Sequence, residues 1–527
     1  MRLARTCCSG TLSSTLNQIK VERCSMGKGE EVTEAALATD VQSENKHRAE
    51  TRPRPFEAIP GIKYFPVVKA IMNHSPFGLQ RVDRMMEASL ANYRKYGKIW
   101  VERMGDTATV NIIDPNDVAT VFKNDGNAPI RHASKALVTA RKKYRRCIGI
   151  ANMQGDEWRR VRRAVQSVVL KPHSLVRFVP DLNTISDDFV DLMKAMRNQN
   201  GEVPDFQNEI YKWSLESVWK VVMGTRLGCL EMSLDSKSEP QLIINATGDF
   251  FACLGRLMFG FQFHKYINTP TWRRFLHSQD TLFRTAQTCV EQTLDRLKAL
   301  ETKGGPGNEA GILMSLLANK ELTNQEMAAM PVELIGGGID TTSNSLVFNL
   351  YNLATNPDKQ EKLQEEIMSV LPISGEITAG ALQKMVYLKG CIKETFRMFP
   401  GGLGVSRITS KDMILSGYHI PAGTRVRSNS IAGLLEDFFP EPETFIPERW
   451  IRGHEMETQA SRFTLLPFGH GVRMCLGRRM AEQELQVVLA KLVRHFRIEW
   501  EHGTMGMKFR ILHVPDKPAR FNFMDRQ

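Results

Sequence analysis

Hydrophobic residues recur every three or four positions through most of the middle of the chain. That spacing puts apolar side chains on one face of an α-helix. It predicts helices between about residues 155 and 370, at Ser186–Met196, Trp272–Leu300 and Pro357–Val370. The same pattern extends over Pro331–Leu353 and over a last helix from about Gly477 to His495. A helix-rich body is therefore expected.

Shorter strand-like segments lie on either side of this helical region. Ile99–Arg103 and Thr109–Ile113 have the composition of strands, and Met104–Asp106 between them predicts a turn. Asp114-Pro115 then predicts the start of a helix. After residue 400, segments punctuated by Gly and Pro predict strands at Arg407–Ile408, Asp412–Leu415 and Thr424–Arg427. The expected fold class is mainly α with small β-sheets.

The N-terminal segment has a different composition. From Met1 to Val21 there is no acidic residue, and Arg2, Arg5 and Lys20 are interleaved with Ser and Thr. This pattern is typical of an organelle transit peptide, although a tail without a targeting role would have a similar composition. We therefore expect a leader at residues 1–50 and one folded domain at residues 51–527. No run of about 18 apolar residues occurs, so no membrane-spanning helix is expected.

Composition narrows the possible classes of protein. A chain of 527 residues exceeds the roughly 250–300 residues of one hydrophobic core, so several domains or one large composite domain is expected. The net charge of +12 favours a local acidic partner or an anionic membrane surface over nucleic acid. The nine cysteines form no C-x-x-C pair, which argues against a disulfide scaffold or zinc module and for a reducing compartment.

The strongest chemical motif is Phe468–Gly477, which runs directly into the last predicted helix. A thiolate at Cys475 would be stabilised by the free amides of that helix N-terminus and by a nearby cation. With each of five fixed positions at about 5% usage, F-x-x-G-x-R-x-C-x-G would arise by chance in roughly one or two such chains in ten thousand. A buried, inert cysteine is the alternative.

These ten residues resemble the cysteine-ligand loop of the cytochrome P450 family. The resemblance implies haem b, iron protoporphyrin IX, with the thiolate of Cys475 on the iron, where it favours O–O cleavage. It also implies that Phe468, Arg473 and Gly477 contact the haem, with Arg473 directed at a propionate. The implied fold places a long central oxygen-binding helix over the haem.

A second match, Gly336–Thr342, falls within the predicted helix Pro331–Leu353. Three glycines destabilise a helix by about 1 kcal/mol each relative to alanine, which indicates a special surface. By resemblance this is the oxygen-binding helix, with Asp340 and Thr341 as the acid and the alcohol that relay protons. Gly337 stands where the family more often has alanine. The residues alone leave open a glycine-kinked packing helix.

Further matches extend the resemblance along the chain. Glu394 and Arg397 resemble the family's E-x-x-R pair, which with Arg449 implies a buried network that braces the ligand loop rather than a catalytic group. Trp158 and Arg162, four residues apart on one helix face, resemble donors to the haem propionates. Arg407 resembles another propionate contact.

The positions of basic residues indicate which kind of electron donor to expect. Arg478-Arg479 at the start of the last helix, and Lys389 and Lys393 one turn apart, resemble the mitochondrial branch of the family. That branch implies a small acidic [2Fe-2S] ferredoxin with its reductase, and peripheral association with the matrix side of the inner membrane. A basic patch near the cysteine would steer such a carrier. A microsomal-type enzyme that uses a diflavin reductase is the alternative.

The substrate pocket implied by the resemblance is mostly apolar or glycine-rich. Its expected walls are Ser134–Ile150, Phe250–Phe263, Val332–Thr341 and Gly401–Val405. A monooxygenase acting on a bulky apolar, sterol-like substrate follows. A haem-thiolate isomerase or dehydratase, or a non-catalytic haem sensor or carrier, would not need Asp340, Thr341 and a basic face together.

Overall fold

The computed structural model describes residues 52–64, 72, 81–104, 107–170, 175–232, 234–259, 263–301, 311–317, 319, 321–372 and 375–526. The chain divides into two units, Met1–Arg52 and Pro53–Gln527, and the second is the one described below. The proposed leader at residues 1–50 and the predicted turn residues 105 and 106 lie outside the described residues.

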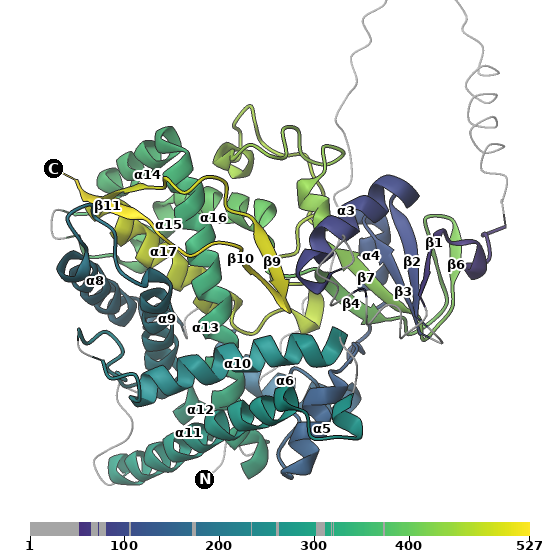
Figure 1. The fold of residues 1–527 in the computed structure, drawn as a ribbon, viewed down its shortest axis with the longest axis horizontal. Helices are drawn as coiled ribbons and strands as arrows, with labels where there is room; N and C mark the ends of the chain where they lie inside the picture. The colour runs from purple at the N-terminus through teal and green to yellow at the C-terminus, as the bar shows by residue number, and fades with distance from the viewer. Residues whose placement is uncertain are drawn as a thin grey trace, which may run out of the picture. The chain divides into compact units, whose positions relative to one another are not determined.

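Helices make up most of the second unit (Figure 1). The helices that precede the central one are α3 (Met85–Tyr96), α4 (Pro115–Lys123), α5 (Lys135–Lys143), α6 (Gly155–Val169), α8 (Val179–Met196), α9 (Phe206–Met223), α10 (Glu239–Phe259), α11 (Pro270–Glu301) and α12 (Ile312–Leu317). The central helix and those that follow are α13 (Asn324–Thr355), α14 (Pro357–Val370), α15 (Ala379–Lys384), α16 (Val386–Met398) and α17 (Arg478–His495). All five predicted helical segments lie in α8, α11, α13, α14 and α17, so the expectation of a mainly α fold is confirmed.

The largest sheet has five strands in the order β1-β2-β3-β7-β4. Its strands are β1 (Gly61–Tyr64), β2 (Ile99–Met104), β3 (Thr107–Ile112), β4 (Gly404–Ile408) and β7 (Arg425–Asn429). β2 and β3 pair antiparallel, with Val101 opposite Val110, as the sequence predicted for two strands joined by a turn. The side chain of Asp114 caps α4 by accepting a hydrogen bond from the amide of Asn116 at 2.8 Å.

Three two-stranded sheets complete the fold within the described residues. They pair β5 (Met413–Leu415) with β6 (Tyr418–Ile420), β8 (Phe496–Glu499) with β11 (Asn522–Asp525), and β9 (Met507–Arg510) with β10 (Leu512–Pro515). The predicted strands after residue 400 correspond to β4, β5 and β7.

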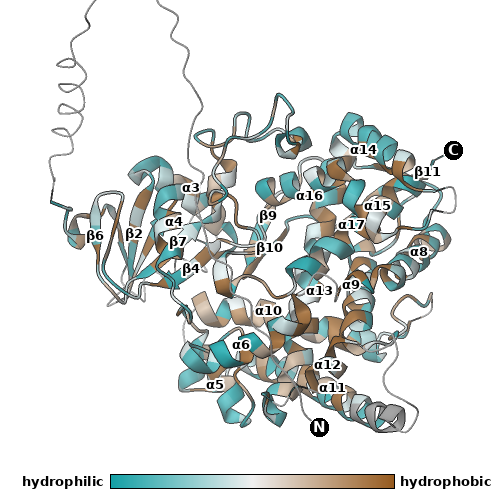
Figure 2. Ribbon diagram, turned by 180° about the vertical axis from the view of Figure 1, so that it is seen from behind, coloured by the Kyte–Doolittle hydropathy of each residue, from teal (hydrophilic) through white to brown (hydrophobic). Residues whose placement is uncertain are grey.

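The main core surrounds α13, which runs through the middle of the helical part (Figures 1 and 2). Leu346, Val347, Leu350 and Leu353 of this helix are fully buried. α13 packs closely against α9 at Gly338, where a Cβ would lie 3.0 Å from Cγ2 of Val218, so a larger residue there would make Val218 shift.

Within the described residues, one helix, α10, is long and apolar enough to cross a membrane by length and composition. Asn245, Thr247 and Asp249 interrupt the apolar residues of α10, but the mean hydropathy of the helix is still high enough for a membrane-spanning segment. A core helix of a globular protein passes the same test. Cys253 and Leu257 of α10 belong to a buried cluster with residues of α5 and α11.

Candidate functional site

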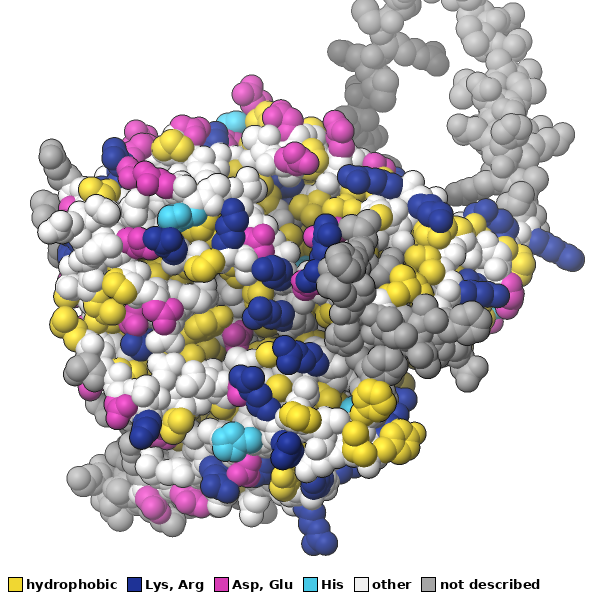
Figure 3. All heavy atoms as spheres, viewed as in Figure 1, with side chains coloured by type: hydrophobic (Ala, Val, Ile, Leu, Met, Phe, Trp, Pro, Cys, Tyr) yellow, Lys and Arg dark blue, Asp and Glu magenta, His cyan; other side chains and the backbone are white. Residues whose placement is uncertain are grey.

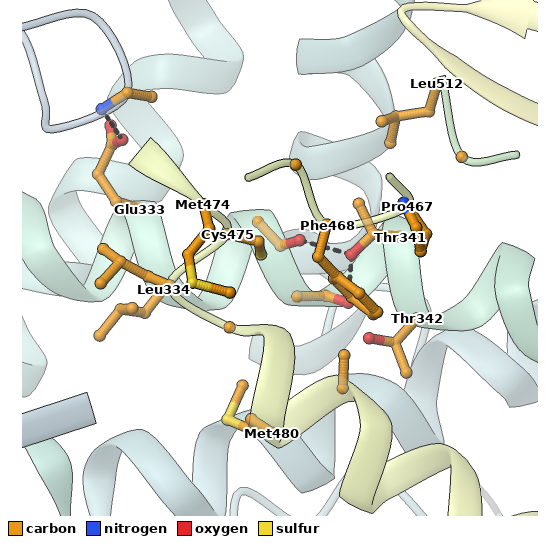
Figure 4. A pocket seen from close by; sticks show the side chains of 18 of the residues that line it. Glu333, Leu334, Thr341, Thr342, Pro467, Phe468, Met474, Cys475, Met480 and Leu512 are labelled. Carbon is orange, nitrogen blue, oxygen red and sulfur yellow. Dashed lines mark hydrogen bonds between the residues drawn. The ribbon is translucent and has the colours of Figure 1, made fainter. Parts of the chain in front are cut away.

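A cavity of about 530 Å3 lies between α13 and the loop that precedes α17. This volume is within the usual range for small-molecule sites. Figure 4 shows Phe468, Met474 and Cys475 of the loop together with Leu334 and Thr341 of α13 at this cavity. The predicted ligand loop and the predicted oxygen-binding helix, more than a hundred residues apart in sequence, therefore meet at one site.

The loop around Cys475 is held in a tight conformation by its own backbone. The amide of Cys475 donates to the carbonyl of Phe468 at 2.9 Å, which closes the loop. Gly469 and Gly471 have φ values of +71°, a region that favours glycine. Gly477 has an ordinary φ, but a Cβ there would touch the Cys475 sulfur at 3.9 Å. The glycines thus set the loop's path and leave space beside the sulfur.

The environment of the sulfur has opposing effects on its ionisation. Burial raises the pKa of the Cys475 thiol, while the amides of Gly477 and Arg478 and the guanidinium of Arg162 oppose that increase. The helix amides and the Arg162 cation therefore lower the pKa of the thiol, as the sequence predicted, and desolvation opposes them. A metal ion deprotonates a coordinating thiol outright, so a haem iron bound here would favour the thiolate further.

Four arginines converge on one end of the cavity: Arg131, Arg162, Arg407 and Arg473. Burial and then the neighbouring arginines lower the pKa of Arg473 to about 9. Its Nε donates to the carbonyl of Pro129 at 2.6 Å and its Nη2 to the carbonyl of Met153 at 2.8 Å, while its buried Nη1 has no partner. An unpartnered cationic donor is a position where a buried anion would be stabilised.

The other predicted propionate donors have additional partners. Trp158 is buried, and its ring lies 4.0 Å below the Arg473 guanidinium. Arg162 donates from Nη2 to the carbonyl of Met474 at 2.8 Å, so it also ties α6 to the ligand loop. Arg407 forms an ion pair with Asp125 at 2.7 Å and donates to the carbonyl of His470 at 3.1 Å. The structure therefore gives each of these side chains a bracing contact beside the cavity.

The site fits haem b on the chemistry of its lining. The sulfur of Cys475 opens into the cavity, and four buried or half-buried arginines with Asp125 as a partner leave an excess of positive charge at one end. Two propionates would offset most of that charge. Across the described residues no group of three or more His, Cys, Asp or Glu side chains could hold a metal. A metal bound mainly by a planar macrocycle, with one thiolate from the protein, agrees with this arrangement.

Asp340 and Thr341 lie on the part of α13 that faces the cavity. The Thr341 hydroxyl donates to the carbonyl of Gly337 at 2.7 Å, as the dashed lines in Figure 4 show. Asp340 is 9% exposed, and burial raises the pKa of its carboxyl to about 7. A Cβ on Gly337 would meet nothing within 4 Å, and Gly337 lines the cavity, so an alanine side chain there would project into open space.

Glu394, Arg397 and Arg449 form a buried network with no exposed charge. Arg397 donates to both oxygens of Glu394 at 2.9 and 2.8 Å, and Nε of Arg449 donates to Oε1 at 3.2 Å. Nε1 of Trp450 donates to Oε2 at 2.9 Å, and Arg397 also reaches the carbonyl of Gly433 at 2.7 Å. These bonds join α16 to the segment that precedes the ligand loop, which agrees with the bracing role predicted for them.

The cations predicted to contact an electron donor differ in exposure. Lys393 and Arg479 are exposed. Lys389 is half-buried and donates to the carbonyl of Gln383 at 2.9 Å. Arg478 pairs with Glu482 at 3.0 Å.

Comparison with known proteins decides the family. A sequence profile described as Cytochrome P450 matches residues 68–523. The chain belongs to the cytochrome P450 family. It is 33% identical to "Cytochrome P450 10" of Lymnaea stagnalis, over 90% of this chain and 87% of that protein. It is 32% identical to "Probable cytochrome P450 301a1, mitochondrial" of Drosophila melanogaster, over 89% of this chain and 86% of that protein.

A vertebrate relative is similarly close. The chain is 34% identical to "Cholesterol side-chain cleavage enzyme, mitochondrial" of Rattus norvegicus, over 82% of each chain. As a cytochrome P450, this protein is a haem-thiolate monooxygenase that binds haem b, as the sequence motifs predicted.

Several residues of the P450 site were not anticipated from the sequence, among them Arg131, Leu512 and His513. Glu333 lies within the predicted wall Val332–Thr341, and its contact with Arg141 at 2.9 Å was also not anticipated. The wall predicted at Phe250–Phe263 is absent from this cavity's described lining. Phe251 and Ala252 line a second cavity instead. These contacts join segments far apart in the chain, and no local motif marks them.

Proposed function

We propose that this P450 is a mitochondrial enzyme that inserts one atom of O2 into a bulky apolar, sterol-like substrate and reduces the other to water. Two electrons would come from a [2Fe-2S] ferredoxin and its reductase, and two protons from solvent. The observation that carries the proposal is the meeting of Cys475, the arginine cluster and the Asp340–Thr341 pair at one cavity.

Each side chain has a proposed part in this reaction. When bound, the haem supplies the iron at which dioxygen is reduced. Cys475 is the proposed iron ligand, with Phe468 and Gly477 packed beside its sulfur. Arg473, Arg162, Arg407 and Trp158 are proposed to hold the propionate edge. Asp340 and Thr341 are proposed to supply protons on the side of α13.

Apolar residues in the cavity lining support an apolar substrate. Ile150, Leu334, Val405 and Leu512 are among them. The carboxylate of Glu333 is already paired with Arg141, and its Oε2 accepts from the amide of Ala151 at 3.3 Å. Since that charge is engaged, it offers no anchor for a cationic substrate. A relative named for cholesterol side-chain cleavage supports a sterol-like molecule.

Mitochondrial location rests on the leader and on the relatives. Residues 1–50 are proposed to be the transit peptide and residues 51–527 the catalytic domain. Two of the relatives above carry "mitochondrial" in their names. Peripheral contact with the inner membrane is supported by Tyr266 and Ile267 between α10 and α11, which are 87% and 61% exposed. Apolar side chains at such exposure are stabilised by a lipid surface.

The first test replaces Cys475 by serine. Because Cys475 is the proposed sulfur ligand, the reduced carbonyl complex of Cys475→Ser should lose its red-shifted Soret band even if haem remains bound. Cys391→Ser is a matched control, since Cys391 is buried on α16 away from the cavity lining. A red-shifted band retained in Cys475→Ser would show that another residue binds the iron.

The second test addresses the electron donor. Reversing Lys389 and Lys393 to glutamate should raise the ferredoxin dissociation constant about tenfold or more, and turnover should fall with added salt. The control reverses Lys63, on β1 of the five-stranded sheet, and Lys411, just before β5, and changes the net charge equally. Unchanged ferredoxin affinity, or faster turnover with a diflavin reductase, would remove the mitochondrial assignment and leave the monooxygenase assignment standing.

A further inference from the structure

His513 of β10 lies in the lining of the cavity that contains Cys475, and none of the roles proposed above uses it. The residue is buried, with 1% of its surface exposed. Its backbone is tied to a neighbouring wall, because the amide of His513 donates to the carbonyl of Gly401 at 3.0 Å. Gly401 also lines the cavity. The imidazole is therefore built into the wall where β10 meets the segment Pro400–Gly404.

The β9–β10 hairpin buries this side chain on one of its faces. His513 pairs with Phe509 across the two strands, so both side chains project from the same face, and their rings lie 5.4 Å apart. Arg510 of β9 projects from the other face and is exposed. Figure 3 shows Lys and Arg side chains gathered on the surface over this hairpin. The hairpin thus leaves charged side chains at the surface and keeps the imidazole in the interior.

The turn between the two strands fixes where His513 lies. Ile511 has a φ of +75°, a conformation that a β-branched residue rarely adopts. The side chain of Ile511 packs against the buried cluster formed by α5, α10 and α11. A strained residue of this kind persists where surrounding contacts hold it, and such residues cluster at ligand-binding sites. The position of His513, two residues later, is therefore set by packing.

The two ring nitrogens of His513 differ in their hydrogen bonding. Nδ1 lies 2.5 Å from the carbonyl oxygen of Pro400, and because a carbonyl only accepts, Nδ1 carries the proton. Nε2 is buried and has no partner among the described residues. Burial lowers the pKa of the imidazole to about 4, so the ring is neutral near neutral pH. In a neutral ring protonated at Nδ1, Nε2 can only accept a hydrogen bond.

Several donors in the lining of the same cavity are already engaged. The hydroxyls of Thr341 and Ser345 and the Nδ2 group of Asn344 each donate to a backbone carbonyl of α13. A buried acceptor without a partner is destabilising, and a donor on a bound molecule would satisfy it. A hydroxyl group can donate, whereas a ketone oxygen only accepts. Nε2 of His513 therefore favours a ligand with a hydroxyl group over the matching ketone.

We propose that His513 is a specificity-determining residue, whose Nε2 accepts a hydrogen bond from the hydroxyl of a sterol in this cavity and discriminates against the corresponding ketone. The inference rests on the sterol-like substrate proposed above and narrows it to a hydroxylated one. His513 lies on β10, whereas Asp340 and Thr341 lie on α13. A hydroxyl bound at His513 therefore orients the substrate, and oxidation takes place at a carbon that faces α13.

Spectral titration of the haem-loaded protein is the first test. The probes are cholesterol, its ketone and its deoxy analogue, which differ only in the hydroxyl, oxo group or hydrogen at one carbon. The wild-type dissociation constant should be about tenfold to a hundredfold lower for cholesterol than for the other two. Equal dissociation constants for the three would overturn this inference. No spectral shift with any of them would instead remove the sterol-like substrate itself.

Two substitutions separate the ring nitrogens. The amide nitrogen of His513→Asn can still donate to Pro400, but nothing replaces Nε2, so the preference for cholesterol should disappear while the protein stays folded. His513→Gln places an amide near the Nε2 position, and because an amide both donates and accepts, this variant should bind cholesterol and gain affinity for the ketone. His264→Asn is the matched control, since His264 also has a buried ring nitrogen without a partner and does not line the cavity. Retention of the preference in His513→Asn would contradict the assignment.

Nitrogen NMR of the reduced carbonyl complex, labelled at the histidine rings, gives a readout that does not depend on affinity. The Nε2 resonance of His513, identified by its loss in His513→Asn, should be that of an unprotonated nitrogen. It should shift when cholesterol binds and stay unchanged with the ketone. A protonated Nε2 in the sterol-free protein would overturn the inference. So would a nitrogen-ligated haem spectrum in the wild type that His513→Asn lacks, because the ring would then bind the iron.

Discussion

Two buried groups of charged side chains lie near the haem site, and they differ in whether their charges are satisfied within the protein. In the first, Glu394 receives hydrogen bonds from Arg397, Arg449 and Trp450, and both Glu394 and Arg397 have 0% exposure. The second is the cluster of Arg131, Arg162, Arg407 and Arg473. Of these, Arg407 pairs with Asp125, Arg131 interacts with Glu333, and one donor of Arg473 is unpartnered.

The difference distinguishes a structural network from a ligand-binding one. A buried ion pair that is fully hydrogen-bonded is destabilised when either partner is removed, because an unpaired charge remains. A cluster with excess positive charge is incomplete without an anion, and its members are destabilised by one another until that anion binds. The first network should therefore govern unfolding, and the second should govern retention of the haem.

The largest expected effect is on the closed network. Glu394→Gln leaves Arg397 and Arg449 buried without their carboxylate, and the free energy of unfolding should fall by about 3–5 kcal/mol. Chemical denaturation of the haem-loaded protein measures this. Asp191→Asn is the control, since Asp191 is 78% exposed and 4.0 Å from Lys194, and such pairs contribute about 0–1 kcal/mol. Equal losses in the two variants would contradict the distinction.

Arg473→Gln should affect haem retention much more than the free energy of unfolding. It removes hydrogen bonds to Pro129 and Met153 but relieves repulsion from the other arginines, so unfolding should change by only about 1–2 kcal/mol. Loss of a charge-assisted contact to a propionate should speed haem transfer to an acceptor protein about tenfold to hundredfold. A variant that unfolds as easily as Glu394→Gln but keeps its haem would reverse the assignment of the two groups.

The smallest expected effect is a change in the pH dependence of stability, caused by Asp125→Asn. Burial raises the pKa of Asp125 despite its contact with Arg407, so the folded state binds more protons than the unfolded state just above the ordinary carboxyl pKa. The unfolding free energy of the haem-free protein should therefore decrease as pH rises through that window, and Asp125→Asn should lack this decrease. Haem transfer should become slightly slower, because the cluster gains net positive charge.

Helix periodicity and local motifs predicted many of this protein's secondary-structure elements and the cysteine site. The spacing of apolar residues predicted α8, α11, α13, α14 and α17, because a helix places every third or fourth side chain on one face. Turn and capping residues predicted the β2–β3 pair and the start of α4. The loop Phe468–Gly477 predicted the cysteine site, since its glycines and its position before a helix are local features of the chain.

Tertiary structure alone decided how these parts act together. It decided which arginines meet, because Arg131, Arg162, Arg407 and Arg473 come from four segments of the chain. It showed that burial outweighs the helix amides at Cys475, a balance that depends on everything packed around the sulfur. It also separated the three glycines of α13: Gly338 packs closely against Val218, Gly337 borders the cavity, and a Cβ on Gly336 would meet nothing within 4 Å. Periodicity and motifs are properties of neighbouring residues, whereas charge balance, desolvation and cavities depend on residues brought together only by folding.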